Sequence, residues 1–168
     1  MKPYLYILGV LLVGGGIGYF IGQKSAILER KSQQWREANQ NDESSVREVL
    51  FGLSEAYRLH DSLLLFKDCA NTYVEIDGIT GEARGLEKSV LASYELFRTG
   101  QSVAFSLKDI DVKILHNSAL VRAGYSKTSE LFEKEGITGL LGQGLWIMSK
   151  SSGKWQVDAF WQIEESKR

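Results

Sequence analysis

A run of twenty residues without a charge, residues 3–22, is the feature that most constrains this chain. As a helix, such a run rises about 30 Å, the thickness of the hydrocarbon core of a bilayer. Tyr4, Tyr6 and Tyr19 lie toward its two ends, where aromatic rings favour the membrane interface. A helix buried in a globular core normally keeps a polar face, and this run has none. The sequence therefore predicts a membrane-spanning anchor over residues 1–22.

Removal of this segment as a signal peptide is the alternative interpretation. Lys2 suits the basic start of a signal peptide, but Lys24 occupies a position before the plausible cut where a small residue is needed. No cysteine closely follows the run, so it has no attachment site for a lipoprotein anchor. We therefore expect an uncleaved, single-pass anchor.

Basic residues on both sides of the run leave its orientation open. The amino-terminal side carries Lys2 and the α-amino group, an arrangement that is also typical of an anchor with its N-terminus inside the cell. The other side carries four basic residues within about 15 positions, the distance over which such charges act: Lys24, Arg30, Lys31 and Arg36. This count leans toward a cytoplasmic soluble part.

Three glycines inside the run, Gly14, Gly18 and Gly22, repeat every four residues. On a helix this spacing places them on one face, which lets a second helix approach closely. Glycine is also common in membrane helices without such a role. The pattern predicts either pairing of the anchor with itself or with a membrane-protein partner, or no specific contact.

The remainder of the chain divides into a linker and one domain. Residues 23–43 are polar and contain neither proline nor glycine, which predicts a linker, possibly helical. Residues 44–168 are long enough to bury a core. They carry 15 basic and 17 acidic residues, a balance that gives no electrostatic case for binding nucleic acid. One cysteine and two histidines offer neither an internal disulfide nor a His-rich metal site, so we expect no metal and no cofactor.

Helical spacing of apolar residues predicts three helices in the first half of this domain. Their expected ranges are 45–60, 62–70 and 86–100, with a short strand over 72–77. The first helix is expected to begin at a capping box formed by Ser45 and Glu48, and Asp61 to cap the second. A turn is expected after the strand, marked by Gly78, Gly81 and Gly85.

The second half of the domain alternates with a period of two and predicts four long antiparallel strands. The apolar parity switches near residues 108–109, which predicts a β-bulge. Two further strands follow, the second over 137–148, and one face of the last is expected to hold Trp155, Val157, Ala159, Trp161 and Ile163. Helices followed by strands predict an α+β fold, with the helices packed on one face of a strongly bent, mostly antiparallel sheet.

This layout resembles the NTF2-like superfamily, which includes the ketosteroid-isomerase and SnoaL-like domains. The resemblance covers about residues 45–163. Three places carry it: the break at His60-Asp61 with the segments 64–66 and 72–75 that follow, the passage 81–86, and the closing segments 144–146 and 152–157. It implies an NTF2-like cone with an apolar pocket between three N-terminal helices and the bent sheet, and dimerisation through that sheet.

Ketosteroid-isomerase chemistry can be tested against the residues. It needs a carboxylate base, and a tyrosine and a protonated acid that stabilise an oxyanion. Glu75 and Asp77 are available on the first strand as the base, and Tyr57 lies closer to the helix break than the family's tyrosine does. The second acid would fall near Leu145, but no carboxylate occurs between residues 136 and 148. Steroid isomerase activity is therefore not expected, and no catalytic residue is assigned.

The candidate pocket residues have alternative interpretations that the sequence leaves open. Gln143 either donates into a pocket or occupies an exposed sheet position, and Asp158 is either a solvated strand residue or a pocket acid. Tyr57 and Trp146, like Trp161, either line a ligand cavity or belong to the core. Cys69 is expected to be a buried, inert thiol. The pocket candidates are Tyr57, Glu75, Asp77, Gln143, Trp146 and Asp158.

Two functional hypotheses follow. The preferred one is a membrane-anchored, non-catalytic protein-interaction or assembly module, similar in plan to secretion-system components that place an NTF2-like domain after one span. The alternative is a SnoaL-like domain, tethered to the membrane, that binds or converts a small apolar ligand. A carboxylate that points into a closed pocket would favour the alternative. A filled cone with an apolar patch on the outer sheet would favour the assembly module, including a homodimer.

Overall fold

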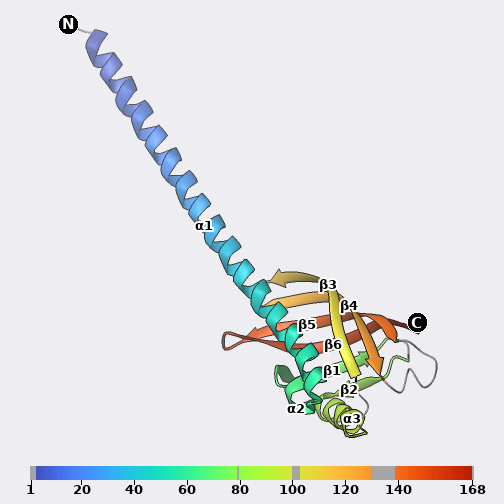
Figure 1. Cartoon of the computed structure of the whole chain (residues 1–168). Coiled ribbons are helices and arrows are strands. Elements are labelled where there is room, and N and C mark those ends of the chain that lie inside the picture. The colour runs from blue at the N-terminus through green and yellow to red at the C-terminus, as the bar shows by residue number, and fades with distance from the viewer. Residues whose placement is uncertain (1–2, 79, 100–102, 130–138, 168) are drawn as a thin grey trace. The chain divides into compact units, whose positions relative to one another are not determined.

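The computed structural model describes residues 3–78, 80–99, 103–129 and 139–167, and their side chains from residue 29 to residue 163 except at position 129. Two compact units are present, residues 1–41 and residues 42–168. The elements in chain order are α1 (Pro3–Leu59), α2 (Ser62–Leu65), β1 (Cys69–Asp77), β2 (Ala83–Gly85), α3 (Leu86–Arg98), β3 (Val103–Leu115), β4 (Ser118–Ser129), β5 (Leu140–Ser151) and β6 (Lys154–Lys167), as Figure 1 shows.

The first helix differs from the sequence prediction. One helix, α1, runs through the predicted anchor, the predicted linker and the first predicted domain helix, so Ser45 lies inside a helix and the predicted capping box is wrong. The physical reason is that residues 23–43 contain no proline or glycine that would interrupt the helix. Across the stretch of chain with described side chains, no helix is long and apolar enough to cross a membrane. The predicted anchor, with Gly14, Gly18 and Gly22, lies outside those described side chains.

The second helix is a single turn, α2, because the chain turns into β1 earlier than predicted. The cap is confirmed, since the Asp61 carboxylate accepts hydrogen bonds from the backbone N–H groups of Leu63 and Leu64, both at 2.9 Å. The turn predicted after β1 is followed by the short strand β2, and Gly81 in that turn has a φ of 73°, which glycine adopts without strain. The third helix, α3, is confirmed within two residues at its end.

Six strands form one sheet in the order β2-β1-β6-β5-β4-β3. Among the described strands only the pairing of β1 with β6 is parallel, so the prediction of a mostly antiparallel sheet is confirmed. The predicted bulge in β3 is also confirmed. Its register with β4 shifts between Lys108 and Asp111, and Asp109 has a φ of 51°.

The last strand contains bulges that the sequence did not reveal. Its register with β5 shifts so that Val157 pairs with Met148 but Ala159 pairs with Ile147, which leaves Asp158 as the extra residue. The parity of the strand changes at that point. Phe160 therefore packs against the core, while Trp161 is 46 % exposed. The predicted single face from Trp155 to Ile163 is wrong.

The core lies on one face of the sheet, which we call the inner face. Val46 and Leu50 of α1 are fully buried there against side chains of β4, β5 and β6. The sheet side of this core consists of Tyr73, Ala119, Val121, Ala123, Trp146, Met148, Trp155 and Val157. Burying these side chains removes large apolar areas from water, and this is the main force that holds the helix on the sheet.

Candidate functional site

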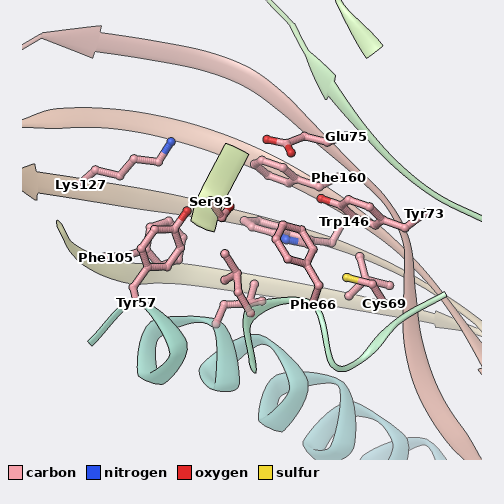
Figure 2. Close-up of a pocket in the computed structure, with 13 residues that line it drawn as sticks. Tyr57, Phe66, Cys69, Tyr73, Glu75, Ser93, Phe105, Lys127, Trp146 and Phe160 are labelled. Carbon is pink, nitrogen blue, oxygen red and sulfur yellow. The ribbon is translucent and has the colours of Figure 1, made fainter. Parts of the chain in front are cut away.

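A cavity of about 80 Å³ opens on the inner face, between the end of α1, the α2–β1 connection, α3 and the sheet (Figure 2). Most of its lining is apolar. The apolar lining residues are Leu53, Leu65, Phe66, Phe105, Trp146, Val157 and Phe160. The polar ones are Tyr57, Cys69, Tyr73, Glu75, Ser93 and Lys127. An apolar cavity with a few converging polar groups is the usual form of a small-molecule site.

Stacked aromatic pairs form two parts of the wall. Tyr57 of α1 stacks on Phe105 of β3 with ring centroids 4.8 Å apart and planes at 24°. Trp146 of β5 stacks on Phe160 of β6 at the same centroid distance, with planes at 30°. Offset stacking of this kind stabilises each pair beyond the burial of its area. These contacts fix the orientations of four of the rings that bound the cavity.

Glu75 brings a carboxylate to the cavity from β1. Ser89 of α3 donates a hydrogen bond from Oγ to Glu75 Oε2 at 2.8 Å, and Ser89 is only 1 % exposed. Arg84, which pairs with Glu75 across β1 and β2, places Nη2 3.9 Å from Oε1. A buried hydroxyl and a guanidinium thus orient the carboxylate, which keeps acceptor capacity for a ligand.

Burial changes the acidity of two other lining groups. Removal from water, with smaller contributions from the charges of Asp68 and Glu75, raises the pKa of the Cys69 thiol to about 12. Removal from water also raises the pKa of the Tyr73 phenol, and the charge of Glu75 adds to the effect. Both groups are therefore neutral at physiological pH, and Cys69 is a weak nucleophile whose side chain is partly buried rather than buried as predicted.

Lys127 is the cation of the cavity lining and comes from β4, with Nζ 4.9 Å from the centroid of the Tyr125 ring. Figure 2 shows its side chain entering from the side opposite to Tyr73 and Cys69. The same view shows the Tyr57 hydroxyl directed toward Ser93 of α3. The cavity therefore presents a carboxylate, an ammonium group and hydroxyls from different elements.

The structure brings three of the six sequence-predicted residues together, since Tyr57, Glu75 and Trp146 all line the cavity. The other three make contacts elsewhere. Asp77 accepts a hydrogen bond from the backbone N–H of Thr80 at 3.0 Å in the turn after β1. Gln143 accepts two from Arg122, at 2.7 and 3.1 Å, and Asp158 accepts one from Ser149 at 3.0 Å. Gln143 is partly buried and lies, with Arg122, in a separate hollow outside this cavity.

Sequence analysis did not identify Ser93, Lys127 or Phe160 as lining residues. Lys127 could have been found, because it continues the alternation of Ala123 and Tyr125 on the inner face of β4. Ser93 could not have been found, because the apolar spacing of a helix does not show which of its serines faces a cavity. Phe160 was hidden by the bulge at Asp158.

Comparison with solved structures identifies the architecture. An NTF2-like protein of unknown function from Pseudomonas putida KT2440 matches with a TM-score of 0.63 at 17 % identity, over 73 % of this chain and 86 % of that one. The fold is NTF2-like. A candidate dehydratase from the NTF2-like family of Streptomyces avermitilis matches with a TM-score of 0.63 at 13 % identity, over 74 % of this chain and 96 % of that one.

A third similar structure is a candidate aromatic ring hydroxylase from Novosphingobium aromaticivorans, with a TM-score of 0.60 at 12 % identity, over 76 % of this chain and 94 % of that one. No family model matches the sequence, and no curated protein matches it either. At these identities the likeness shows the NTF2-like fold, and the activities named belong to those neighbours.

Proposed function

We propose that residues 42–168 form a small-molecule-binding domain whose ligand occupies the inner-face cavity. The observation that carries this proposal is the carboxylate of Glu75, which lines an otherwise mainly apolar cavity and is oriented there by Ser89. The Glu75 side chain is only 25 % exposed, and Ser89 and Arg84 hold it in place, so the domain supplies a fixed hydrogen-bond acceptor within a mainly apolar lining, as small-molecule sites do. This supports the SnoaL-like ligand-binding hypothesis over the assembly module.

Native mass spectrometry of the full chain, released from a mild detergent, tests this function. We expect the additional mass of one small molecule on the wild-type chain and its loss in Trp146→Ala, which removes part of the cavity wall. Trp35→Ala is the matched control, because Trp35 is 67 % exposed on α1 and outside the cavity lining. A wild-type chain that never carries a ligand, even after incubation with an extract of small molecules, would contradict the proposal.

We further propose that residues 3–22 hold the chain in a membrane as a single span, as the uncharged run supports. The basic residues that follow the span favour an orientation in which residues 42–168 lie on the cytoplasmic side. Extraction of membranes with alkaline carbonate tests the anchor. The full chain should stay in the pellet, and its release into the supernatant would show that residues 3–22 do not span the bilayer.

Assembly is the second candidate function, and exposed apolar side chains on the other face of the sheet favour it. Leu120 pairs with Ile147, and Trp161 lies one strand further, opposite Leu145. Leu120, Ile147 and Trp161 are 39 %, 44 % and 46 % exposed, and such a patch is typical of a protein-interaction surface. A homodimer through this patch should dissociate in Ile147→Lys but not in Leu91→Lys, where Leu91 is an exposed residue of α3. Analytical ultracentrifugation distinguishes these outcomes.

A further inference from the structure

Two hydrogen-bond donors in the cavity lining have no hydrogen-bond partner among the described residues, and the inference drawn from them rests on the proposed binding function. They are the phenol O–H of Tyr73 on β1 and the indole N–H of Trp146 on β5. The two residues are 5 % and 3 % exposed. By contrast, the indole N–H of Trp155, outside the cavity lining, donates to Asp42 at 3.3 Å. Buried tyrosine and tryptophan side chains normally find a partner, so two unpaired donors in one cavity need an explanation.

Both donors reach the space inside the cavity. Among the described side chains that are not exposed, Arg84 Nε is the one nitrogen or oxygen atom that is both sealed from solvent and unpaired. Tyr73 Oη and Trp146 Nε1 are unpaired without being sealed, so each contacts space that water or a ligand can enter. Figure 2 shows the Tyr73 hydroxyl directed toward Phe160 and Trp146. Because both residues are almost fully buried and line the cavity, the space they contact is the cavity.

The charged groups of the lining already have interactions of their own, so they do not call for a charged ligand. Glu75 accepts a hydrogen bond from Ser89 and lies beside Arg84. The Lys127 ammonium group lies over the ring of Tyr125. What the cavity leaves unmatched is therefore a pair of neutral donors. An indole N–H can only donate, and a phenol that stays protonated presents its hydrogen to an acceptor.

We propose that the ligand is a small, uncharged carbonyl compound whose oxygen accepts hydrogen bonds from Tyr73 and Trp146. A carbonyl oxygen offers two lone pairs and no hydrogen, so it complements two donors. Only β6 lies between β1 and β5, so the two backbones are about 10 Å apart, a gap that these two long side chains can close from both sides. A full charge would lose more hydration in this mainly apolar space than two neutral donors replace.

The volume of the cavity restricts the size of the ligand. At about 80 Å³ it is roughly half that of a cavity of about 150 Å³ that accepts benzene. One small ring is therefore the upper limit without movement of the walls.

A matched pair of probes, cyclopentanone and methylenecyclopentane, tests the proposal by NMR on the full chain in lipid nanodiscs. The two molecules share one ring and nearly one shape, and the ketone oxygen of the first is replaced by a methylene group in the second. We expect the ketone to bind about tenfold more tightly, because the alkene leaves both donors unpaired. The indole N–H proton of Trp146 should move downfield with the ketone and not with the alkene, and that of exposed Trp161 is the internal control.

Tyr73→Phe removes the hydroxyl and keeps the ring. It should reduce the preference for the ketone from about tenfold to less than about threefold. Tyr94→Phe is the matched control and should keep the full preference, because Tyr94 is 52 % exposed on α3 and outside the cavity lining. Each probe partitions into the lipid equally for all three chains, so a change in the ratio of affinities reports the site. A hydroxyl with no partner in the chain can be removed without loss, so the urea midpoint of Tyr73→Phe should not fall below that of the control.

Different failures have different meanings. If the ratio of the two affinities is the same in wild type and Tyr73→Phe, a trapped water is the partner of the hydroxyl, and the inference is wrong while the binding function stands. The inference is also wrong if cyclopentanecarboxylate binds the wild-type chain more tightly than cyclopentanone, or if Tyr73→Phe unfolds at a lower urea concentration than Tyr94→Phe. If neither member of the probe pair moves the Trp146 resonance of the wild-type chain, the proposed binding function is itself wrong and the inference falls with it.

Discussion

The close packing of Gly144 against the aromatic cavity wall predicts that Gly144→Ala lowers the free energy of unfolding, whereas alanine at a glycine in open space raises it. A methyl group at Gly144 would lie 2.6 Å from Cε2 of Phe160 and 2.6 Å from Cη2 of Trp146. Carbon atoms in contact normally stay about 3.5–4.0 Å apart, so both rings would have to move by about 1 Å. Because these rings stack on each other, neither moves alone. Overpacking of this kind costs about 1–3 kcal/mol in the free energy of unfolding.

Gly52 provides the matched control in the same unit of the chain. It lies within α1, and a methyl group there would meet nothing within 4 Å. Replacing a helical glycine by alanine in open space stabilises a protein by about 0.5–1 kcal/mol. We therefore expect Gly144→Ala to lower the stability of the domain and Gly52→Ala to raise it.

Urea unfolding, followed by tryptophan fluorescence, measures both effects on the same scale. The midpoint should move down for Gly144→Ala and up for Gly52→Ala, with an unchanged dependence on urea concentration. The result that would refute the reasoning is a Gly144→Ala chain as stable as wild type while Gly52→Ala behaves as expected. It would mean that Trp146 and Phe160 do not pack over Gly144 in the cavity wall.

Two further predictions concern charge. Asp42 accepts hydrogen bonds from Lys150 Nζ and, at 3.3 Å, from Trp155 Nε1, and both partners are partly or largely buried. Asp42→Ala should therefore lower the free energy of unfolding by about 1–3 kcal/mol. Asp42→Asn keeps an acceptor and should lower it by less. The thiol of Cys69 has a pKa of about 12 in the folded chain and about 9 when exposed, so ionisation favours the unfolded state above pH 9. The free energy of unfolding should fall by up to about 1.4 kcal/mol per pH unit between pH 9 and 12. Urea titrations of the wild-type chain and of Cys69→Ala at several pH values test this, because the variant should lack this contribution to the pH dependence.

Much of the fold could be predicted from the sequence because its signals are local. The cap at Asp61, the stripe of α3 and the parity switch in β3 each depend on residues that are neighbours in the chain. The start of the domain could not be predicted in this way. Ser45 and Glu48 have the spacing of a capping box, but a cap forms only where a helix begins, and the chain before Ser45 is already helical.

The candidate site was less predictable, because its residues come from elements that are distant in sequence. Glu75 was identified from its strand, but its partner Ser89 lies fourteen residues away on α3, and only the packing of α3 against β1 brings them together. Lys127 lies in register with the buried residues of β4, but lysine side chains are usually exposed to solvent. The residue type therefore favoured an outward position. Gln143 and Asp158 were candidates because of their places in the strand alternation, and hydrogen bonds with Arg122 and Ser149 occupy them.

The bulge at Asp158 links the two surfaces on which function is proposed. Without the extra residue, β6 would continue the parity of Val157, so Trp161 would face the inner side and Phe160 the outer side. With it, Phe160 stacks on Trp146 in the cavity wall, and Trp161 joins the exposed apolar patch of the outer face. A single inserted residue therefore sets both the wall against which a ligand would lie and the surface through which a second copy would pack. Because a bulge leaves no signature in hydrophobic alternation when both exchanged residues are aromatic, the sequence predicts neither surface correctly at this point.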